Sequence, residues 1–217
     1  VNKRFMRLVM PRLYVILDAG LMTGSAETTA RQLIEAGVRM LQYRSKGGSA
    51  HETLELSRKL AALAGTGNAT LFVNDRPDIA FISGAAGVHV GQEDLTVADA
   101  RKVIGPDRWI GVSTHNEEQF REAIETSADY IAVGPVFATK SKANPDPVVG
   151  MEFIRRVRGL TPKPIVAIGG ITLDRAAEVI EAGADSVAVI SDILRAEHPA
   201  TRARQYLDRL QSLASRS

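Results

Sequence analysis

The segment PIVAIGGITLDRAAEVIEAGADSVAVIS, residues 164–191, decides the fold. Two short runs of β-branched and small apolar residues, 164–168 and 186–190, flank a stretch of helical periodicity that opens after Thr172. Both runs are apolar on the two faces of a pleat, as expected for parallel strands that are covered on both sides. The segment therefore predicts one strand–helix–strand unit with a buried parallel pair.

The same alternation continues along the whole chain. Capping pairs such as Ser49 with Glu52, Thr96 with Asp99 and Asn116 with Gln119 mark helix starts between the apolar runs. An open doubly wound sheet could also hold these strands, but no G-x-G-x-x-G follows the first of them, which favours a closed barrel. The predicted strands are 13–17, 38–43, 70–74, 87–91, 109–113, 130–134, 164–168 and 186–190.

The expected fold is α/β, a single (β/α)₈ TIM barrel. One domain covers residues 1–217, with the barrel proper at about 12–195 and a C-terminal helix at about 198–215. A short similarity between helix end and strand recurs at 35–42, 84–91, 127–134 and 182–189, which is typical of a repeated βα unit. Its brevity also fits the shared demands of any turn between helix and strand.

Composition excludes several classes of protein. Lys and Arg number 27 against 25 Asp and Glu, so no basic surface for nucleic acid is implied. The chain has no cysteine, which excludes disulfides and thiolate metal sites and makes a cytoplasmic setting the expectation. Arg7 interrupts the apolar part of VNKRFMRLVM, so we expect a soluble protein without a signal peptide or membrane span. A homo-oligomer is compatible with the sequence.

In such barrels the active site lies at the carboxyl ends of the strands. Gln42, Arg44 and Lys46 alternate along the end of the second predicted strand and should project to one side. Asn74 and Asp75 follow the third strand, and Asp94 lies shortly after the fourth. Mg²⁺ prefers one or two carboxylates together with phosphate oxygens, while Arg and Lys neutralise the remaining charge. The residues that follow the second, third and fourth strands therefore predict a magnesium–pyrophosphate site.

The remaining strand ends predict a second place for an anion. Gly169-Gly170 follows the seventh strand and Ser191 the eighth, where backbone N–H groups can approach a phosphate closely. The long connection after the sixth strand, which includes GPVFATKSK at 134–142, carries two lysines beside two hydroxyls and is typical of a binding loop.

Several motifs in one order resemble the thiamine phosphate synthase family across roughly residues 12–195. They are QYRSK at 42–46, ND at 74–75, GVHVGQED at 87–94, GVS at 111–113, GPVFATKSK at 134–142, AIGGI at 167–171 and VIS at 189–191. Tyr43 and Ser45 stand where the family more often has Leu or Phe and Glu. The lysine register between Lys140 and Lys142 is ambiguous.

The resemblance implies a role for each matching residue. Arg44, Lys46, Ser113 and Lys142 would form the catalytic set that contacts the pyrophosphate. Asp75 and Asp94 would hold Mg²⁺ as cofactor. The substrate-binding set would be Gln42 and Asn74 for the aminopyrimidine, Thr139 and Ser141 for the thiazole, and Gly170, Ile190 and Ser191 for its phosphate.

The activity implied by the resemblance is a transfer reaction. It would couple 4-amino-2-methyl-5-hydroxymethylpyrimidine pyrophosphate with 4-methyl-5-(2-phosphoethyl)thiazole, or its carboxylated form. The pyrophosphate leaves first, and the thiazole nitrogen captures the pyrimidine-methyl cation. Two other functions stay open: a thiazole tautomerase of the same superfamily, and a non-catalytic protein that binds a phosphorylated metabolite.

Plainer structural roles stand beside these assignments. Asp75 would also serve as a helix cap, and Arg44 and Lys46 as solvated surface charges. Gly169-Gly170 would suit a tight turn, and Ser191 an N-cap. His89 lies in an apolar strand and is expected to be an oriented structural histidine. The other histidines have no partner in the sequence that defines a metal site and are expected at the surface: His51, His115 and His198.

Overall fold

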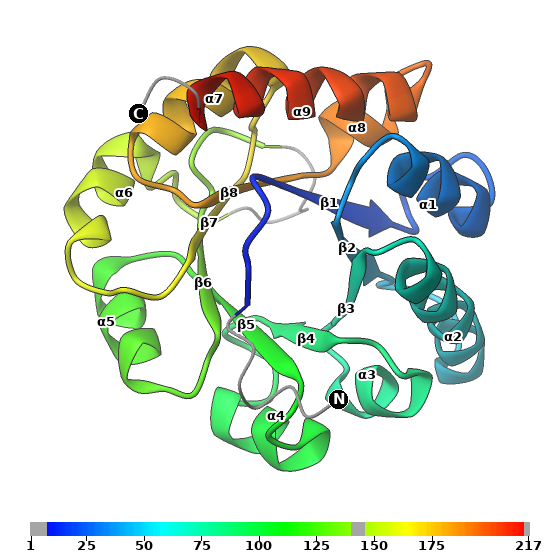
Figure 1. The fold of residues 1–217 in the computed structure, drawn as a ribbon. Helices are drawn as coiled ribbons and strands as arrows, with labels where there is room; N and C mark the ends of the chain where they lie inside the picture. Colours follow the sequence, from blue (N-terminus) through cyan, green and yellow to red (C-terminus); the bar gives the residue numbers. More distant parts are fainter. Residues whose placement is uncertain (1–7, 140–145, 215–217) are drawn as a thin grey trace.

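The structure is a computed structural model that describes residues 8–139 and 146–214. Parallel strands pair in chain order, and β8 pairs with β1, so the sheet closes into a barrel. Figure 1 shows this ring of strands with the helices outside it. The strands are β1 Leu13–Asp18, β2 Met40–Arg44, β3 Thr70–Asn74, β4 Gly87–Val90, β5 Trp109–Thr114, β6 Tyr130–Val133, β7 Ile165–Ile168 and β8 Ser186–Val189.

Helices alternate with the strands, and three of the predicted caps are confirmed. Ser49 and Glu52 form a reciprocal capping box, and the side chains of Thr96 and Asn116 each accept from the backbone N–H three residues on. The helices are α1 Ala26–Glu35, α2 Ala50–Thr66, α3 Pro77–Ser83, α4 Val97–Ile104, α5 Glu117–Glu125, α6 Gly150–Arg158, α7 Leu173–Glu181, α8 Ser191–Leu194 and α9 Pro199–Ala214.

The predicted (β/α)₈ barrel is thus confirmed, and every predicted strand end lies within two residues of the observed one. The C-terminal helix expected at about 198–215 corresponds to α9, which packs across α1, α7 and α8 (Figure 1). Thr172 precedes α7 as expected, but its side chain makes no capping hydrogen bond. The Leu173 N–H donates instead to the Asp192 carboxylate at 3.3 Å.

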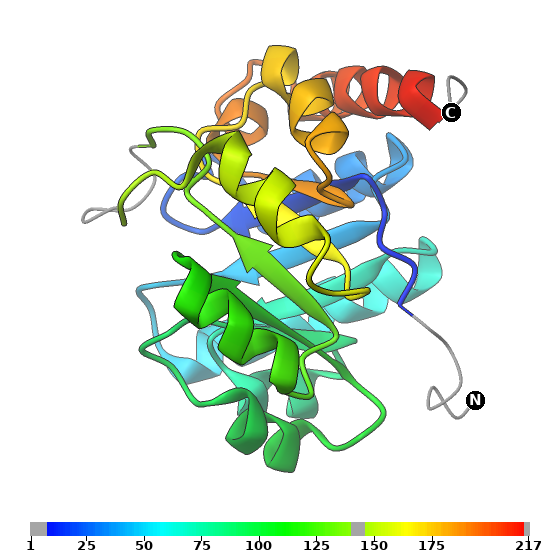
Figure 2. The same cartoon turned by 90° about the vertical axis from the view of Figure 1, so that its left-hand side faces the viewer.

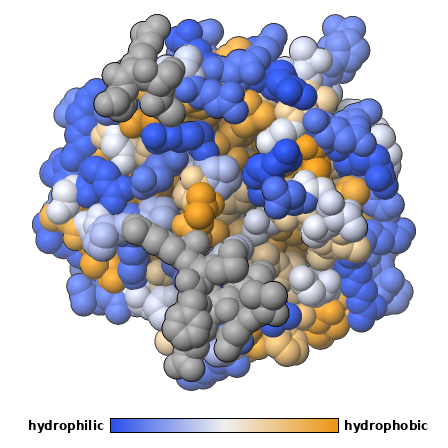
Figure 3. All heavy atoms as spheres, viewed as in Figure 1, coloured by the Kyte–Doolittle hydropathy of each residue, from blue (hydrophilic) through white to orange (hydrophobic). Residues whose placement is uncertain are grey.

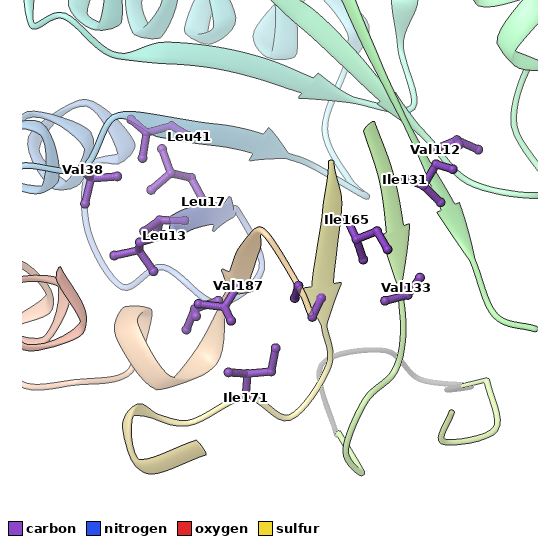
Figure 4. Packing of buried hydrophobic residues seen from close by; sticks show 14 of the residues in the cluster. Leu13, Leu17, Val38, Leu41, Val112, Ile131, Val133, Ile165, Ile171 and Val187 are labelled. Atoms are coloured by element: carbon purple, nitrogen blue, oxygen red, sulfur yellow. The ribbon is translucent and has the colours of Figure 1, made fainter. Parts of the chain in front are cut away.

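The larger hydrophobic core lies between the strands and the helices. Leu13 and Leu17 of β1, Leu41 of β2 and Val187 of β8 point into this layer, as Figure 4 shows. All four side chains are buried. The next residue along each strand points to the other face, because side chains alternate along a β-strand.

That other face fills the inside of the barrel. Tyr14, Phe72 and Tyr130 meet there with ring centroids 5.6–6.1 Å apart. Two glycines make room for these rings. A Cβ at Gly111 would lie 2.0 Å from Tyr130 Cζ, and one at Gly87 would lie 2.6 Å from Phe72 Cε1. Large aromatic side chains on β3 and β6 therefore depend on glycines in β4 and β5.

The amino-terminal end of the barrel is covered by the segment that leads into β1. Leu8 is only 9% exposed and packs with the inner cluster, beside Met10. Figure 3 shows hydrophilic side chains around the edge of this face and hydrophobic ones toward its middle. Figure 2 shows that this segment and the connection leaving β6 lie at opposite ends of the barrel. The segment before β1 therefore covers the amino-terminal end of the barrel, and the carboxyl end is available for a site.

Two of the recurring sequence segments share one structural device. Asp129, before β6, accepts from a backbone N–H of β5 and from Arg101 Nη2, each at 2.8 Å. Asp185, before β8, accepts in the same way from a backbone N–H of β7 at 2.8 Å and from Arg158 Nη1 at 2.6 Å. The repeat therefore serves the turn that connects a helix with the next strand.

No helix in the described part of the chain combines the length and the apolar content that a membrane crossing requires.

Candidate active site

A cavity of about 800 Å³ opens at the carboxyl ends of the strands, and side chains from all eight strands line it. All the predicted site residues in the described part of the chain border this cavity. They are Gln42, Arg44, Lys46, Asn74, Asp75, Asp94, Ser113, Thr139, Gly170, Ile190 and Ser191. Ser141 and Lys142 lie outside the described residues. The structure brings the predicted residues together, and their roles stay predictions.

The two cations after β2 are already paired with carboxylates. Arg44 Nη1 donates to Asp18 Oδ2, and the Asp18 side chain, at the end of β1, is 8% exposed. Lys46 Nζ donates to Asp75 Oδ2 at 2.8 Å, and its side chain is 62% exposed. The half-buried guanidinium is therefore held in a fixed place, whereas the lysine can follow a ligand more freely.

Asp75 and Asp94 approach each other from the ends of neighbouring strands. Asp75 has a φ of 61°, a left-handed conformation that is uncommon for a residue other than glycine. Asp94 Oδ2 accepts from the Gly91 N–H at 2.8 Å. Partial burial, and next the contact with Asp75, raise the pKa of Asp94 above its ordinary value. Two carboxylates this close suit a divalent cation, because a cation between them relieves their repulsion.

Asp75 does not cap the following helix. The N-cap of α3 is Arg76, which makes no capping hydrogen bond with its side chain. Arg76 pairs instead with Asp78. The capping role considered for Asp75 is therefore wrong.

The opposite side of the cavity is formed by two backbone turns. Gly169 and Gly170, after β7, have φ values of 101° and 63°. A Cβ at Gly170 would lie 2.5 Å from the Ala138 carbonyl oxygen, so this turn packs against the connection that leaves β6. Arg175 stacks over Phe137 at 4.6 Å and ties the same two segments together. Glycine is required at 170 both for its conformation and for the close contact.

A tyrosine of α9 positions the second turn. Tyr206 is buried and donates to Asp192 Oδ2 at 2.7 Å, the same oxygen that receives the Leu173 N–H. Burial, and next this carboxylate, raise the pKa of Tyr206. Ile190 and Ser191 lie just before Asp192 and border the cavity. The C-terminal helix thus holds the turn after β8 against the start of α7.

The floor of the cavity contains a group of hydrogen-bonded polar side chains. Gln42 is 2% exposed and its Nε2 donates to the Tyr14 hydroxyl at 2.8 Å. His89 is 8% exposed and lies between the Tyr130 hydroxyl, 2.9 Å from Nδ1, and Ser113 Oγ, 2.8 Å from Nε2. Burial lowers the pKa of His89 to about 4. The two hydrogen bonds orient the ring, as expected of an oriented structural histidine, and they connect two hydroxyls at the base of the site.

His115 is not the surface residue that the sequence suggested. It borders the cavity with a side chain 21% exposed, and its Nδ1 lies 2.6 Å from the Gly134 carbonyl oxygen. Because a carbonyl can only accept, Nδ1 is the donor. Nε2 faces Asp146 Oδ2 at 3.6 Å, just beyond the undescribed part of the β6–α6 connection. His51 and His198 are exposed, as expected.

Sequence reasoning missed part of the site. Asp18 follows the first apolar run directly, so reading the residue after every run would have found it. Tyr14 and Tyr130 lie within runs that look wholly structural, and nothing in the sequence distinguishes them from core residues.

Fold and site together define a (β/α)₈-barrel protein whose cavity, at the carboxyl ends of the strands, pairs cations and carboxylates with a glycine-rich turn. A family model described as thiamine monophosphate synthase matches residues 13–193, and the chain belongs to that family. A thiamine-phosphate synthase of Koribacter versatilis is 51% identical over 210 residues, which cover 94% of this chain and 98% of the relative.

Two further comparisons agree with this. A thiamine-phosphate synthase of Chloroflexus aurantiacus is 42% identical over 198 residues, covering 89% of this chain and 90% of the relative. The solved structure of a thiamine phosphate pyrophosphorylase from Pyrococcus furiosus superposes with a TM-score of 0.85 at 33% identity, over 93% of this chain and 96% of that one. The chain is an enzyme of the transferase class, and these relatives support a thiamine-phosphate synthase function.

Proposed function

We propose that this enzyme makes thiamine phosphate and pyrophosphate from the pyrimidine pyrophosphate and the thiazole phosphate, plain or carboxylated. One observation carries the substrate assignment: a single cavity offers two separate environments for anions. Arg44 and Lys46 stand with Asp75 and Asp94 on one side, and the turn at Gly170 forms the other. A substrate pair with a pyrophosphate on one partner and a phosphate on the other matches both.

The pyrophosphate is assigned to the side with the cations. Asp18 holds the Arg44 guanidinium in place, so little side-chain freedom is lost when the ligand binds. Lys46 exchanges its bond to Asp75 for the ligand, and Ser113 contributes its hydroxyl from the cavity floor. These three side chains and Lys142 form the proposed catalytic set. Gln42 and Asn74, which also border the cavity, are assigned to the aminopyrimidine.

Asp75 and Asp94 are assigned to Mg²⁺. Their close approach and the raised pKa of Asp94 fit a pair of carboxylates that share a cation. No group of three His, Cys, Asp or Glu side chains suited to a metal occurs among residues 8–139 and 146–214. Two carboxylates are nevertheless enough, because Mg²⁺ takes its other ligands from substrate phosphates and water. When bound, the ion supplies positive charge beside the leaving pyrophosphate.

The proposed reaction is a dissociative substitution. The bond between the methylene carbon and the pyrophosphate oxygen breaks with both electrons leaving on the oxygen, and Arg44, Lys46 and Ser113 stabilise that developing charge. The thiazole nitrogen then captures the pyrimidine-methyl cation with its lone pair. That nitrogen carries no proton, so the step requires no general base.

The thiazole phosphate is assigned to the turns after β7 and β8, on the side of the cavity opposite the cations. Gly170, Ile190 and Ser191 border the cavity at the strand ends where barrels commonly bind phosphate. Thr139, and Ser141 beyond the described residues, lie on the connection that packs against the Gly170 turn and are assigned to the thiazole ring. The nitrogen of the thiazole would then face the pyrimidine across the cavity.

Turnover tests the proposal directly. The protein is incubated with both substrates and Mg²⁺, and the products are identified by mass. Thiamine phosphate with an equal amount of pyrophosphate is the expected result. Isomerisation of a thiazole phosphate without the pyrimidine would instead indicate the tautomerase, and binding without turnover would indicate the metabolite-binding protein.

The cellular setting and assembly are also proposals. The absence of cysteine from the sequence supports a cytoplasmic setting. The near balance of 27 Lys and Arg against 25 Asp and Glu supports small-molecule substrates over nucleic acid. A homo-oligomer is compatible with this function, and light scattering of the purified protein decides its size.

A further inference from the structure

A chain of hydrogen bonds crosses the barrel beneath the cavity and joins residues of five strands. Gln42 Nε2 donates to the Tyr14 hydroxyl at 2.8 Å, and the Tyr14 and Tyr130 hydroxyls are 3.2 Å apart. The Tyr130 hydroxyl is 2.9 Å from His89 Nδ1, and His89 Nε2 is 2.8 Å from Ser113 Oγ. Both ends of the chain, Gln42 and Ser113, border the cavity.

The glutamine sets the direction of every proton in this chain. An amide nitrogen can only donate, so the oxygen of Tyr14 must accept. The proton of Tyr14 then goes to Tyr130, the other hydrogen-bond partner that the described residues give it. The Tyr130 proton is therefore left for His89 Nδ1, which must be the acceptor.

The histidine carries the same direction forward. The ring is neutral in this arrangement, because a nitrogen that accepts from Tyr130 carries no proton of its own. A neutral imidazole that accepts at Nδ1 carries its proton on Nε2 and donates it to Ser113 Oγ. The Ser113 hydroxyl then has an occupied acceptor site and a proton that is free to point into the cavity.

We infer that Gln42, through Tyr14, Tyr130 and His89, fixes Ser113 as a hydrogen-bond donor toward the cavity. Tyr14, Tyr130 and His89 are positioning residues in this arrangement, and only the ends of the chain face the ligand. Gln42 Oε1 remains as an acceptor at one end, and the Ser113 O–H is a donor at the other. The chain therefore connects two recognition groups of opposite polarity.

The catalytic consequence rests on the proposed function. An amino group on the pyrimidine can donate to Gln42 Oε1, and the departing pyrophosphate can accept from Ser113. Bonds in a chain polarise one another when they point the same way. Seating the correct pyrimidine at Gln42 would then strengthen the Ser113 donor at the group that leaves.

The tautomer of His89 tests the direction independently of turnover. Long-range ¹⁵N–¹³C correlation spectra of the ligand-free protein distinguish imidazole protonated at Nε2 from imidazole protonated at Nδ1. Protonation at Nε2 is expected. Protonation at Nδ1 would mean that Ser113 donates to the ring, and it would overturn the inference.

Gln42→Glu asks whether residue 42 controls that tautomer. An ionised carboxyl can only accept, so each bond in the chain should reverse and the His89 proton should move to Nδ1. If the introduced carboxyl stays protonated, it donates as the amide does, and the proton should remain on Nε2. The ¹³C shift of the carboxyl shows which case applies. A His89 tautomer that does not follow the state of the carboxyl would refute the inference.

A control variant separates the chain from a direct effect of charge. In Gln42→Glu combined with Tyr14→Phe, the same carboxyl is present but the chain is cut, and Tyr130 can still donate to His89. The protonation of His89 should then be the same as in Tyr14→Phe alone, because residue 42 no longer reaches His89 through the chain. A difference between these two variants would show that charge acts through space, and it would refute a role for the chain.

A kinetic cycle tests the link from His89 to Ser113. The His89 ring centroid lies 5.6 Å from that of Tyr130, and His89→Phe keeps an aromatic ring at this place but removes both nitrogens. We expect Ser113→Ala to lower kcat about 10- to 100-fold, as expected for a lost hydrogen bond to a charged group, and His89→Phe to lower it about 10-fold. The double variant should be no slower than Ser113→Ala alone. Multiplicative losses would show that His89 acts independently of Ser113.

A matched control completes the kinetic test. His198→Phe changes a histidine whose side chain is 75% exposed, and kcat should stay unchanged. If the protein shows no coupling activity at all, the proposed function fails, while the spectra of His89 still decide the direction of the chain.

Discussion

Lys46 Nζ lies 2.8 Å from Asp75 Oδ2, so the cation assigned to the pyrophosphate is bonded to a carboxylate assigned to the metal. The two groups neutralise each other at the edge of the cavity, and in the proposed function both would exchange partners when metal and pyrophosphate bind. The role of Lys46 therefore stays a prediction, which its replacement tests.

Lys46→Met should therefore raise KM for the pyrimidine pyrophosphate by about 10- to 100-fold, the effect of losing a hydrogen bond between charged groups. KM for the thiazole phosphate should change less than about 2-fold, because that substrate is assigned to the other side of the cavity. Steady-state kinetics with each substrate varied in turn measures both. The control is Lys59→Met, which removes a lysine paired with Glu27 at 3.0 Å outside the site. Equal changes in the two KM values would contradict the assignment.

Asp75 and Asp94 should act as one unit toward Mg²⁺. If both hold one ion, Asp75→Asn or Asp94→Asn alone removes most of its benefit, and the double variant should be little slower than either. The cycle is measured at limiting and at saturating Mg²⁺, where the single variants should need at least about 10-fold more metal. Independent, multiplicative losses with an unchanged requirement for Mg²⁺ would show that the two carboxylates do not share an ion.

At neutral pH and without metal, the ionised Asp94 should lower the free energy of unfolding of the protein. Burial and the contact with Asp75 raise its pKa in the folded state above the ordinary 3.8, so the folded state disfavours its charge. The folded state favours the protonated carboxyl, so the stability that Asp94 contributes is complete below pH 3.8 and is lost as the pH rises through its raised pKa. Asp94→Asn keeps an acceptor for the Gly91 N–H, and it should therefore raise Tm without metal.

We expect a rise of about 2–4 °C at pH 7, which corresponds to about 1 kcal/mol in a domain of this size. The side chain is only partly buried, so solvent screening keeps the effect to about this size. Thermal unfolding followed by circular dichroism from pH 3.5 to 8 measures it, with chelator present. A gain that grows as the pH falls would contradict the predicted sign.

The fold was readable because the physical requirements of a barrel repeat eight times along the chain. Every strand is buried on both faces, so each appears as an apolar run, and helix caps such as Ser49 and Asn116 mark the starts of intervening helices. The ends of the strands do not coincide with the ends of the apolar runs, because strand pairing stops where neighbouring strands stop. For β2, Val38 is buried but lies before the first paired residue.

For the site, the sequence predicts which residues lie together but not which of them contact each other. The rule that barrel sites lie at the carboxyl ends of strands brought Arg44, Asp75 and Asp94 together correctly. It could not show that Arg44 pairs with Asp18, or that Tyr14 meets Tyr130 across 116 residues of sequence. Alternation indicates which side chains point inward, but contacts between inward groups depend on the register and stagger of the closed sheet.

Gly111→Ala should destabilise the barrel, because the added methyl group would lie 2.0–2.5 Å from three atoms of the Tyr130 side chain. Overpacking of this kind costs about 1–3 kcal/mol, or roughly 2–12 °C in Tm. The matched control is Gly65→Ala, an interior position of α2 with nothing within 4 Å of the new Cβ, which should raise stability by up to about 1 kcal/mol. Equal effects of the two changes in urea unfolding would show that Tyr130 does not need the space.

The turn after β8 offers a cleaner test of the phosphate assignment than the turn after β7. At Gly170 any side chain would meet the Ala138 oxygen, so a loss of binding there could arise from packing alone. Ser191 is half-buried at the edge of the cavity, and Ser191→Asp adds a negative charge with little extra volume. Repulsion of a phosphate dianion at close range should weaken thiazole phosphate binding by at least about 10-fold, or about 1.4 kcal/mol.

Calorimetry of thiazole phosphate binding measures this effect, and raising the ionic strength should reduce it, because exposed charges are screened. Ser212→Asp, on the exposed part of α9, adds the same charge away from the cavity and should leave the affinity unchanged. The pyrimidine pyrophosphate supplies a second control, since its KM should change less than that of the thiazole phosphate. Unaltered thiazole phosphate affinity in Ser191→Asp would move the phosphate site away from the β8 turn and leave the Lys46 side of the cavity as the place to look for both anions.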